Sequence, residues 1–202
     1  FAGKHTFDAG GTAQRLTFEG FVSANISRPN RPRGELGFLK PVIRRSFLER
    51  HGLIYDERMR LGEDFDLYAR MLLAGARFRI IAACGYVATE RATSLSARHL
   101  SSDLEGLIAA DSRMLARSLS SDARKVLTAH HAQCAKRWHH RCFLDAKRQK
   151  GLFRALAESA TLPRLIRDAA IGITQDKWRA RKLRRTENDR QIPSEPRFLV
   201  RP

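Results

Sequence analysis

The sequence contains no run of about 18 consecutive apolar residues, so no membrane-spanning helix is expected. It shows no signal peptide either, because its first residues are small and polar. Three cysteines, Cys84, Cys134 and Cys142, form no Cys-x-x-Cys pair, and an odd number does not fit a disulfide framework. This cysteine usage indicates a reducing, cytoplasmic setting. Because the chain begins at Phe1 instead of methionine, we expect it to be a piece of a longer protein.

Acidic residues are scarce. Among 202 residues there are 21 Asp and Glu against 38 Lys and Arg, which gives a formal net charge of +17. Residues 136–185 hold 15 Lys and Arg against 4 Asp and Glu, a net charge of +11. A field of this sign attracts phosphates and is compatible with nucleic acid, anionic lipid or a phosphorylated substrate. The length allows one domain with a sizeable core but not two full ones.

The first 98 residues mix helix and strand patterns. Gly62–Gly75 forms the clearest helix, because carboxylates occupy its first turn and Phe65, Tyr68 and Leu72 recur at helical spacing. The other elements expected in this part are a helix at 16–26, a strand at 38–43, a helix at 44–51 and a strand at 77–81, with loops at 1–14 and 86–96.

After His99 the pattern is helical. Leucines recur at helical spacing through residues 100–119, and a second helix is expected behind Ser120 or Ser121 as N-cap. Gly151 is expected to end that helix. A further helix opened by Pro163 and a loose tail at 186–202 complete the predicted elements.

The turn and helix start Gly62-Glu63-Asp64-Phe65-Asp66 is the first candidate for chemistry. Asp64 follows a turn directly, so its carboxylate can point out of the helix end into a cleft. The positive end of the helix dipole favours the ionised form, which a general base requires. Acidic residues are also common in first helical turns for stability alone, so these five residues leave both interpretations open.

Further motifs surround this turn in a fixed order. They are Phe38-Leu39-Lys40-Pro41, Arg44-Arg45-Ser46-Phe47-Leu48, His51-Gly52-Leu53, Tyr55-Asp56-Glu57-Arg58 and Ser94-Leu95-Ser96. From about residue 34 to residue 99, their order and spacing closely resemble the second half of family 2 glycosyltransferases of the GT-A fold. The resemblance implies an α/β, partial GT-A fold that lacks its N-terminal nucleotide-binding half. It places the acceptor side of the catalytic domain in residues 1–98, a basic helical region in 99–185 and a loose tail in 186–202.

The resemblance also implies roles for single residues. In that family, the aspartate that corresponds to Asp64 deprotonates the acceptor hydroxyl, which then displaces the diphosphate of a UDP-sugar with inversion. Glu63 would orient the loop or contact the acceptor, and Glu35 and Lys40 are assigned to acceptor binding. Arg91 stands where family members often carry histidine; its fork suits diphosphate oxygens, and a solvated loop arginine is the equally weighted alternative.

The metal motif of the family is missing, because no Asp-x-Asp precedes Gly62. Mg²⁺ or Mn²⁺ is therefore expected in the intact enzyme, with its ligands mostly in the missing half. For the same reason, we expect these 202 residues alone to be inactive and to bind UDP weakly or not at all.

Four sequence segments outside these motifs indicate a narrower group within the family. They are Gly20-Phe21-Val22, Asn25-Ile26-Ser27, Gly34-Glu35-Leu36-Gly37-Phe38 and Gly151-Leu152-Phe153-Arg154-Ala155-Leu156. These segments resemble glucosyltransferases of succinoglycan-like exopolysaccharide biosynthesis. The implied donor is UDP-glucose, and the implied acceptor is an oligosaccharide on a polyprenyl-diphosphate lipid. The implied location is cytoplasmic and peripheral at the inner membrane.

A metal site is a second candidate. Its potential ligands are His130, His131, Cys134, His139, His140 and Cys142. His130 and Cys134 are four residues apart and share a helix face. No Cys-x-x-Cys or His-Glu-x-x-His pattern supports the site, and Trp138 with nearby cations is typical of an ordinary amphipathic helix. We therefore expect no metal here.

The basic end of the chain is the third candidate. An aromatic residue with flanking cations is typical of a membrane-surface anchor, and a solvated face is the simpler interpretation. The residues are Lys177, Trp178, Arg179, Arg181, Lys182, Arg184 and Arg185. A basic helical nucleic-acid-binding module without enzymatic activity is the alternative function. That alternative explains the end of the chain but not the motif order before it, so we consider nucleic acid an unlikely partner.

Overall fold

The computed structural model describes residues 14–28, 36, 39–81, 101–160, 167–168, 170–174 and 177–178. Its elements, in chain order, are β1 (Gln14–Leu16), α1 (Phe18–Ala24), α2 (Arg45–His51), α3 (Glu63–Leu73), β2 (Phe78–Ile80), α4 (Ser101–Leu115), α5 (Ser121–Lys150) and α6 (Leu152–Ala160). None of the helices in these ranges is long and apolar enough to span a bilayer.

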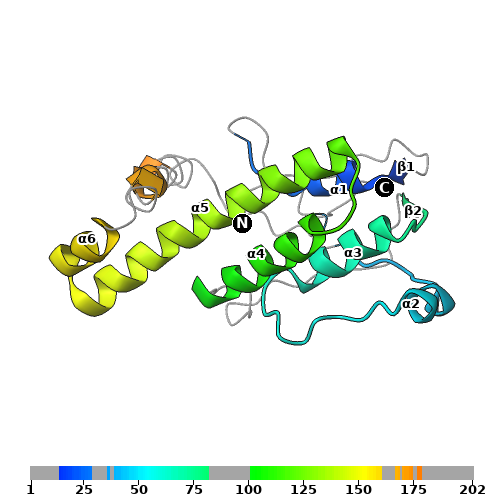
Figure 1. The fold of residues 1–202 in the computed structure, drawn as a ribbon, viewed down its shortest axis with the longest axis horizontal. Coiled ribbons are helices and arrows are strands. Elements are labelled where there is room, and N and C mark those ends of the chain that lie inside the picture. Colours follow the sequence, from blue (N-terminus) through cyan, green and yellow to red (C-terminus); the bar gives the residue numbers. More distant parts are fainter. Residues whose placement is uncertain are drawn as a thin grey trace, which may run out of the picture.

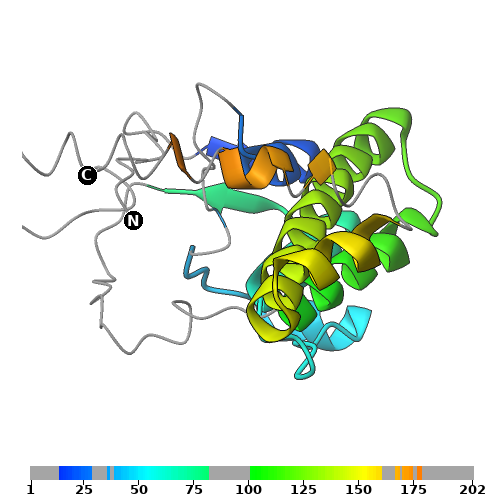
Figure 2. The ribbon, with the colours of Figure 1, turned by 90° about the vertical axis from the view of Figure 1, so that its left-hand side faces the viewer.

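The described part of the chain is mostly helical. Figure 1 shows α5 running along the molecule, with α1 beside its N-terminal half and α6 beyond its C-terminal end. Helix α4 packs along α5, and α3 packs against both α1 and α4. Figure 2, viewed from the α6 end, shows α6 lying beside the last turns of α5. These contacts make α5 the axis on which the other helices assemble.

A small sheet lies at the end of the molecule opposite α6 (Figure 1). Strands β1 and β2 pair antiparallel, with Gln14 opposite Ile80 and Leu16 opposite Phe78. Leu16, Phe78 and Ile80 are buried, so the sheet presents one apolar face to the core. Within the described residues, the expected α/β arrangement is therefore limited to this two-stranded sheet.

The larger of the two apolar clusters in the described residues connects the first half of the chain with the second. Phe21 and Phe65 stack with their ring centroids 5.3 Å apart, and Tyr68 meets Phe21 edge-on. Leu107 of α4 and Leu127 of α5 are buried in the same cluster. The core thus draws on both sides of residue 98, while the boundaries 1–98, 99–185 and 186–202 stay a prediction.

Most predicted elements are confirmed where the structure describes them. Helices α1, α2, α3, α4 and α5 and strand β2 lie where the sequence patterns place them. Ser120 is the N-cap of α5, and its side chain accepts a hydrogen bond from the backbone of Ala123. The sequence analysis missed β1, because three residues next to a helix start give too short a pattern.

The strand predicted at 38–43 is wrong in its described part, because residues 39–43 have no strand structure. The backbone N–H of Leu39 donates to the carbonyl of Leu36, and the Leu39 carbonyl accepts from the hydroxyl of Tyr68. Partners within the loop and on α3 therefore replace a sheet ladder.

Gly62 is required by the turn that starts α3. Its φ is +76°, and a Cβ at this position would lie 2.8 Å from Cδ1 of Leu107. We expect Gly62→Ala to lower the free energy of unfolding by about 1–3 kcal/mol, measured by urea denaturation. Gly75→Ala is the matched control: its φ is +87°, but no atom lies within 4 Å of the added Cβ. Equal losses in both variants would contradict a specific role for the contact with Leu107.

Candidate functional site

Asp64 lies at the start of α3, directly behind the left-handed turn at Gly62. Glu63, Asp64 and Asp66 all fall in the first turn of the helix, where the dipole stabilises carboxylates. The side chain of Asp64 is 21% exposed, so it is held by the protein yet reachable from solvent. Asp66 is fully buried and serves a different purpose.

Three side chains surround the carboxylate of Asp64. The hydroxyl of Tyr55 donates to Oδ1 at 2.8 Å, and Nζ of Lys40 donates to Oδ2 at 3.2 Å. The hydroxyl of Tyr68 lies 3.5 Å from Oδ1 and donates to the carbonyl of Leu39 at 3.1 Å. Lys40, Tyr55, Asp64 and Tyr68 are called the Asp64 site below. It joins α3 to the loops on either side of α2.

The two tyrosines of the site stay protonated over the physiological range. Burial, followed by the hydrogen bond to Asp64, raises the pKa of Tyr55 above its usual value. Burial also raises the pKa of Tyr68, and its hydrogen bond to Tyr55 adds to the effect. The hydroxyl of Tyr55 is therefore a donor that fixes the direction of the Asp64 carboxylate, while the hydroxyl of Tyr68 donates its proton to the carbonyl of Leu39.

Neighbouring ion pairs hold the loop before α3 in place. Asp66 accepts from Nε of Arg70 at 2.8 Å, and the same guanidinium donates to the carbonyl of Ile54 at 2.7 Å. The guanidinium of Arg58 lowers the pKa of Asp56 to about 2, so that carboxylate is ionised at any physiological pH. Through the guanidinium of Arg70, Asp66 therefore holds the loop segment next to Tyr55 in place. This structural contact explains why the side chain of Asp66 is buried.

The arrangement is compatible with a general base and also with a purely structural carboxylate. Both oxygens of Asp64 accept hydrogen bonds from side chains on the loops that flank α2, and the side chain is partly open to solvent. A ligand hydroxyl that takes the place of one donor would lie within proton-transfer distance of the carboxylate. The site therefore offers an oriented acceptor for a proton.

The structure brings together two of the residues predicted from the sequence, Asp64 and Lys40. Glu63 is half-buried beside Asp64 in the same helical turn. Lys177 and Trp178 lie in a helical segment and are exposed. The remaining predicted residues lie outside the described ranges: Glu35, Arg91, Arg179, Arg181, Lys182, Arg184 and Arg185.

The sequence analysis did not assign a role to Tyr55 or Tyr68. Tyr68 stands four residues after Asp64 on one helix, a spacing that brings side chains together. That signal was present, but Tyr68 also fits the apolar face of α3, which is how the pattern was interpreted. Tyr55 reaches Asp64 across a turn, so no helical or strand period could have indicated the contact.

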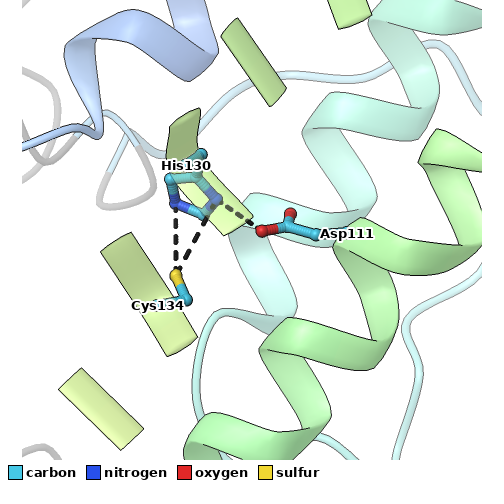
Figure 3. Close-up of side chains that lie close together, drawn as sticks. All are labelled: Asp111, His130 and Cys134. Carbon is cyan, nitrogen blue, oxygen red and sulfur yellow. Dashed lines mark hydrogen bonds and ion pairs between the residues drawn. The ribbon is translucent and has the colours of Figure 1, made fainter. Parts of the chain in front are cut away.

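A second group of polar side chains lies between α4 and α5 (Figure 3). Asp111 comes from α4, while His130 and Cys134 come from successive turns of α5, and all three are buried. One potential ligand atom from each lies within 4.8 Å of the other two. The shared helix face of His130 and Cys134 is confirmed. Asp111 lies 19 residues before His130 and on another helix, so no helical spacing in the sequence could have indicated their contact.

The contacts within this trio describe a buried ion pair more than a set of metal ligands. Nδ1 of His130 and Oδ2 of Asp111 are 2.8 Å apart, a direct hydrogen bond. Sγ of Cys134 lies 3.9 Å from Nδ1 and 3.8 Å from Nε2 of His130. Because the sulfur is nearly equidistant from the two ring nitrogens, it is directed at neither of them. The imidazole also stacks on Phe65 at 4.3 Å. We keep the prediction of a packed helix without a metal.

The pair holds a shared proton. Burial is the largest single influence and by itself would lower the pKa of His130, but the hydrogen bonds to Asp111 and Cys134 and their charges together outweigh burial and raise the pKa to about 9. Burial raises the pKa of Asp111 too. Because both pKa values are raised, the folded state holds the proton between Nδ1 of His130 and Oδ2 of Asp111 more tightly than the unfolded chain does. The other oxygen, Oδ1 of Asp111, has no hydrogen-bond partner among the described residues.

Four of the six potential ligands considered in the sequence do not join this trio: His131, His139, His140 and Cys142. His131 lies 3.2 Å from the hydroxyl of Ser112, and His139 lies 3.0 Å from Oδ2 of Asp168. The histidines of α5 therefore face several different partners around the helix.

The chain is homologous to proteins of succinoglycan biosynthesis. It is 48% identical over 167 residues to the succinoglycan biosynthesis protein ExoU of Rhizobium meliloti, a match covering 82% of this chain and 49% of ExoU. It is 34% identical over 103 residues to the succinoglycan biosynthesis protein ExoO of the same organism, covering 51% of this chain and 29% of ExoO. The resemblance to proteins of succinoglycan biosynthesis is thereby confirmed.

The chain spans about half the length of ExoU and less of ExoO. No family model matches the chain. No solved structure matches it either.

Proposed function

We propose that the full-length protein is an inverting family 2 glycosyltransferase of the GT-A fold that acts in succinoglycan-like exopolysaccharide biosynthesis. The observation that carries the proposal is the Asp64 site, where a partly exposed carboxylate at a helix start is oriented by Tyr55 and Lys40. Homology to ExoU over most of the chain supports the pathway. The basic charge alone would fit many phosphate-binding proteins, but it would not explain this site.

In the proposed reaction, Asp64 accepts the proton of an acceptor hydroxyl. The hydroxyl oxygen forms a bond to the anomeric carbon of a UDP-sugar, the bond from that carbon to the diphosphate breaks, and UDP leaves with the electron pair. Attack from the face opposite the diphosphate inverts the configuration of the sugar. A base positioned on one side and a stabilised leaving group on the other are what this displacement requires.

Lys40 has a defined part in this proposal. Its ammonium group already lies 3.2 Å from Asp64, so an acceptor that approaches the carboxylate also meets Nζ of Lys40. A cation at that position can donate a hydrogen bond to a neighbouring sugar hydroxyl and hold the acceptor. We assign Glu35 and Glu63 to the same acceptor side, as the family resemblance implies.

The donor side rests on the resemblance. UDP-glucose is the proposed donor, with Arg91 on its diphosphate and Mg²⁺ or Mn²⁺ neutralising the leaving group. The ligands of that metal are assigned to the part of the full-length protein that precedes this chain. The proposed acceptor is a polyprenyl-diphosphate-linked oligosaccharide at the cytoplasmic face of the inner membrane, with Lys177–Arg185 on the anionic surface.

A transfer assay tests the function. Full-length protein is incubated with radiolabelled UDP-glucose, Mg²⁺ or Mn²⁺ and a lipid extract that contains polyprenyl-diphosphate oligosaccharides. We expect label in the lipid fraction and UDP in solution, with inverted configuration at the new linkage. Labelled UDP-galactose and UDP-glucuronic acid serve as donor controls. Absence of transfer from every donor, or retained configuration, would contradict the proposal.

A further inference from the structure

The end of the molecule farthest from the small sheet is formed by the last turn of α5 and the first turns of α6 (Figure 1). Gly151 ends α5, and α6 begins at the next residue, so both helix ends meet at one place. Residues 147–157 are called the α5–α6 tip below. Neither the proposed reaction nor the predicted basic segment at Lys177–Arg185 uses it.

Large apolar side chains are exposed at this tip. Phe153 is 89% exposed, Leu152 45% and Leu156 40%. The three share one side of α6, because Leu156 lies four residues after Leu152 and three after Phe153. Ala155, on another side of the helix, is fully buried in a small cluster with Phe143 of α5. Helix α6 is thus anchored through its small residue and presents its large ones outward.

Cations surround this apolar side without an intervening acid. Lys147, Arg148, Lys150 and Arg154 are all exposed, and no Asp or Glu occurs from Ala146 to Ala157. Of the other exposed apolar side chains in the described residues, Val42 and Ile54 lie in loops, whereas Trp178 lies in a helical segment. The tip therefore combines two properties that occur together at lipid-binding surfaces: apolar side chains that can enter the interface and cations that can contact phosphates.

We propose that the α5–α6 tip docks on an anionic lipid surface, with Phe153, Leu152 and Leu156 entering the headgroup region. The four cations contact lipid phosphates around them. A protein partner would be expected to offer acidic side chains to these cations, but a bilayer with anionic headgroups offers negative charge and an apolar interior at once. The inference does not depend on the sugar-transfer activity, although it agrees with a lipid-linked acceptor.

Vesicle flotation tests the tip with the 202-residue chain. The probes are phosphatidylcholine vesicles with about a third phosphatidylglycerol and vesicles of phosphatidylcholine alone. We expect the double variant Phe153→Ser and Leu156→Ser to weaken binding to the anionic vesicles by about tenfold or more. The double variant Lys150→Gln and Arg154→Gln should weaken binding to anionic vesicles and leave the low binding to neutral vesicles unchanged.

Matched controls separate the tip from general effects. Val42→Ser with Ile54→Ser removes two exposed apolar side chains elsewhere, and Arg50→Gln with Lys125→Gln removes two exposed cations elsewhere. Both controls should bind anionic vesicles as the unmodified chain does. Thermal unfolding followed by circular dichroism verifies that each variant is folded.

Three results would overturn the proposal. The first is unchanged vesicle binding in both tip variants while Arg179→Gln, Lys182→Gln and Arg184→Gln together abolish it, because the basic segment alone would then be the anchor. The second is a shift from dimer to monomer in the tip variants by sedimentation, with no change in vesicle binding, which would make the tip a contact between copies. The third is weaker binding to RNA instead of vesicles, which would make it a nucleic-acid surface.

Discussion

Replacing Asp64 with asparagine in the full-length protein is expected to slow sugar transfer by about a hundredfold or more. Asparagine keeps the size of the side chain and can still accept a hydrogen bond from Tyr55, but it cannot take a proton from the acceptor hydroxyl. The loss should appear in the turnover rate, because the base acts in the transition state. The measurement is the initial rate of label transfer at saturating donor.

Two controls make the result specific to the base. Asp122→Asn changes an exposed carboxylate in the first turn of α5, the same helical position as Asp64, and should leave transfer unchanged. Tyr55→Phe removes the 2.8 Å hydrogen bond to Asp64 and the hydrogen bond of the same hydroxyl with Tyr68, and should lower the rate by about tenfold or less. Near-normal turnover of Asp64→Asn, with donor binding also intact, would contradict the assignment of Asp64 as the base.

Breaking the buried pair of α4 and α5 is expected to have the largest effect on stability. Asp111→Ala leaves His130 buried against Phe65 without its partner. Removing one member of a buried ion pair typically lowers the free energy of unfolding by about 3–5 kcal/mol. Urea denaturation at pH 6, where His130 is protonated in the folded chain, is the measurement.

The same pair predicts a direction for the pH dependence. The pKa of His130 is about 9 in the folded chain against 6.5 for an unperturbed histidine, so the folded state binds the proton more tightly. The stabilisation is fully present below pH 6.5 and is lost as the pH rises to about 9, an expected difference on the order of 2–3 kcal/mol. Asp111→Ala should remove this contribution of His130 to the change of the free energy of unfolding with pH. A parent protein equally stable at pH 6 and pH 9 would contradict the shared proton.

A double variant distinguishes the ion pair from simple packing. Asp111→Leu with His130→Leu replaces both partners with apolar side chains and leaves no buried charge. Such replacements are often neutral or stabilising, so the double variant should be more stable than Asp111→Ala and nearly independent of pH between 6.5 and 9. If the double variant is as unstable as Asp111→Ala, the loss of stability arises from packing against Phe65 and not from an unpaired buried charge.

The helices were predictable because their signals are local. Gly62–Gly75 carries its carboxylates, apolar period and closing glycine within fourteen residues, and the structure confirms α3 there. Ser120 or Ser121 was predicted as the N-cap of α5 for the same reason, and the N-cap is Ser120. The failures are equally informative: the segment at 38–43 is apolar enough for a strand, but its carbonyl at Leu39 finds the hydroxyl of Tyr68 instead.

The sequence by itself determined the order of helices α1 to α5, the position of Asp64 at a helix start and the relation to succinoglycan biosynthesis proteins, since these depend on neighbouring residues and on motif order. Only the tertiary structure decided what faces Asp64. Lys40 is 24 residues away and Tyr55 is 9 residues away, and neither separation matches a helix or strand period. The pairing of Asp111 with His130 and the exposure of Phe153 were decided in the same way, because they depend on how helices pack.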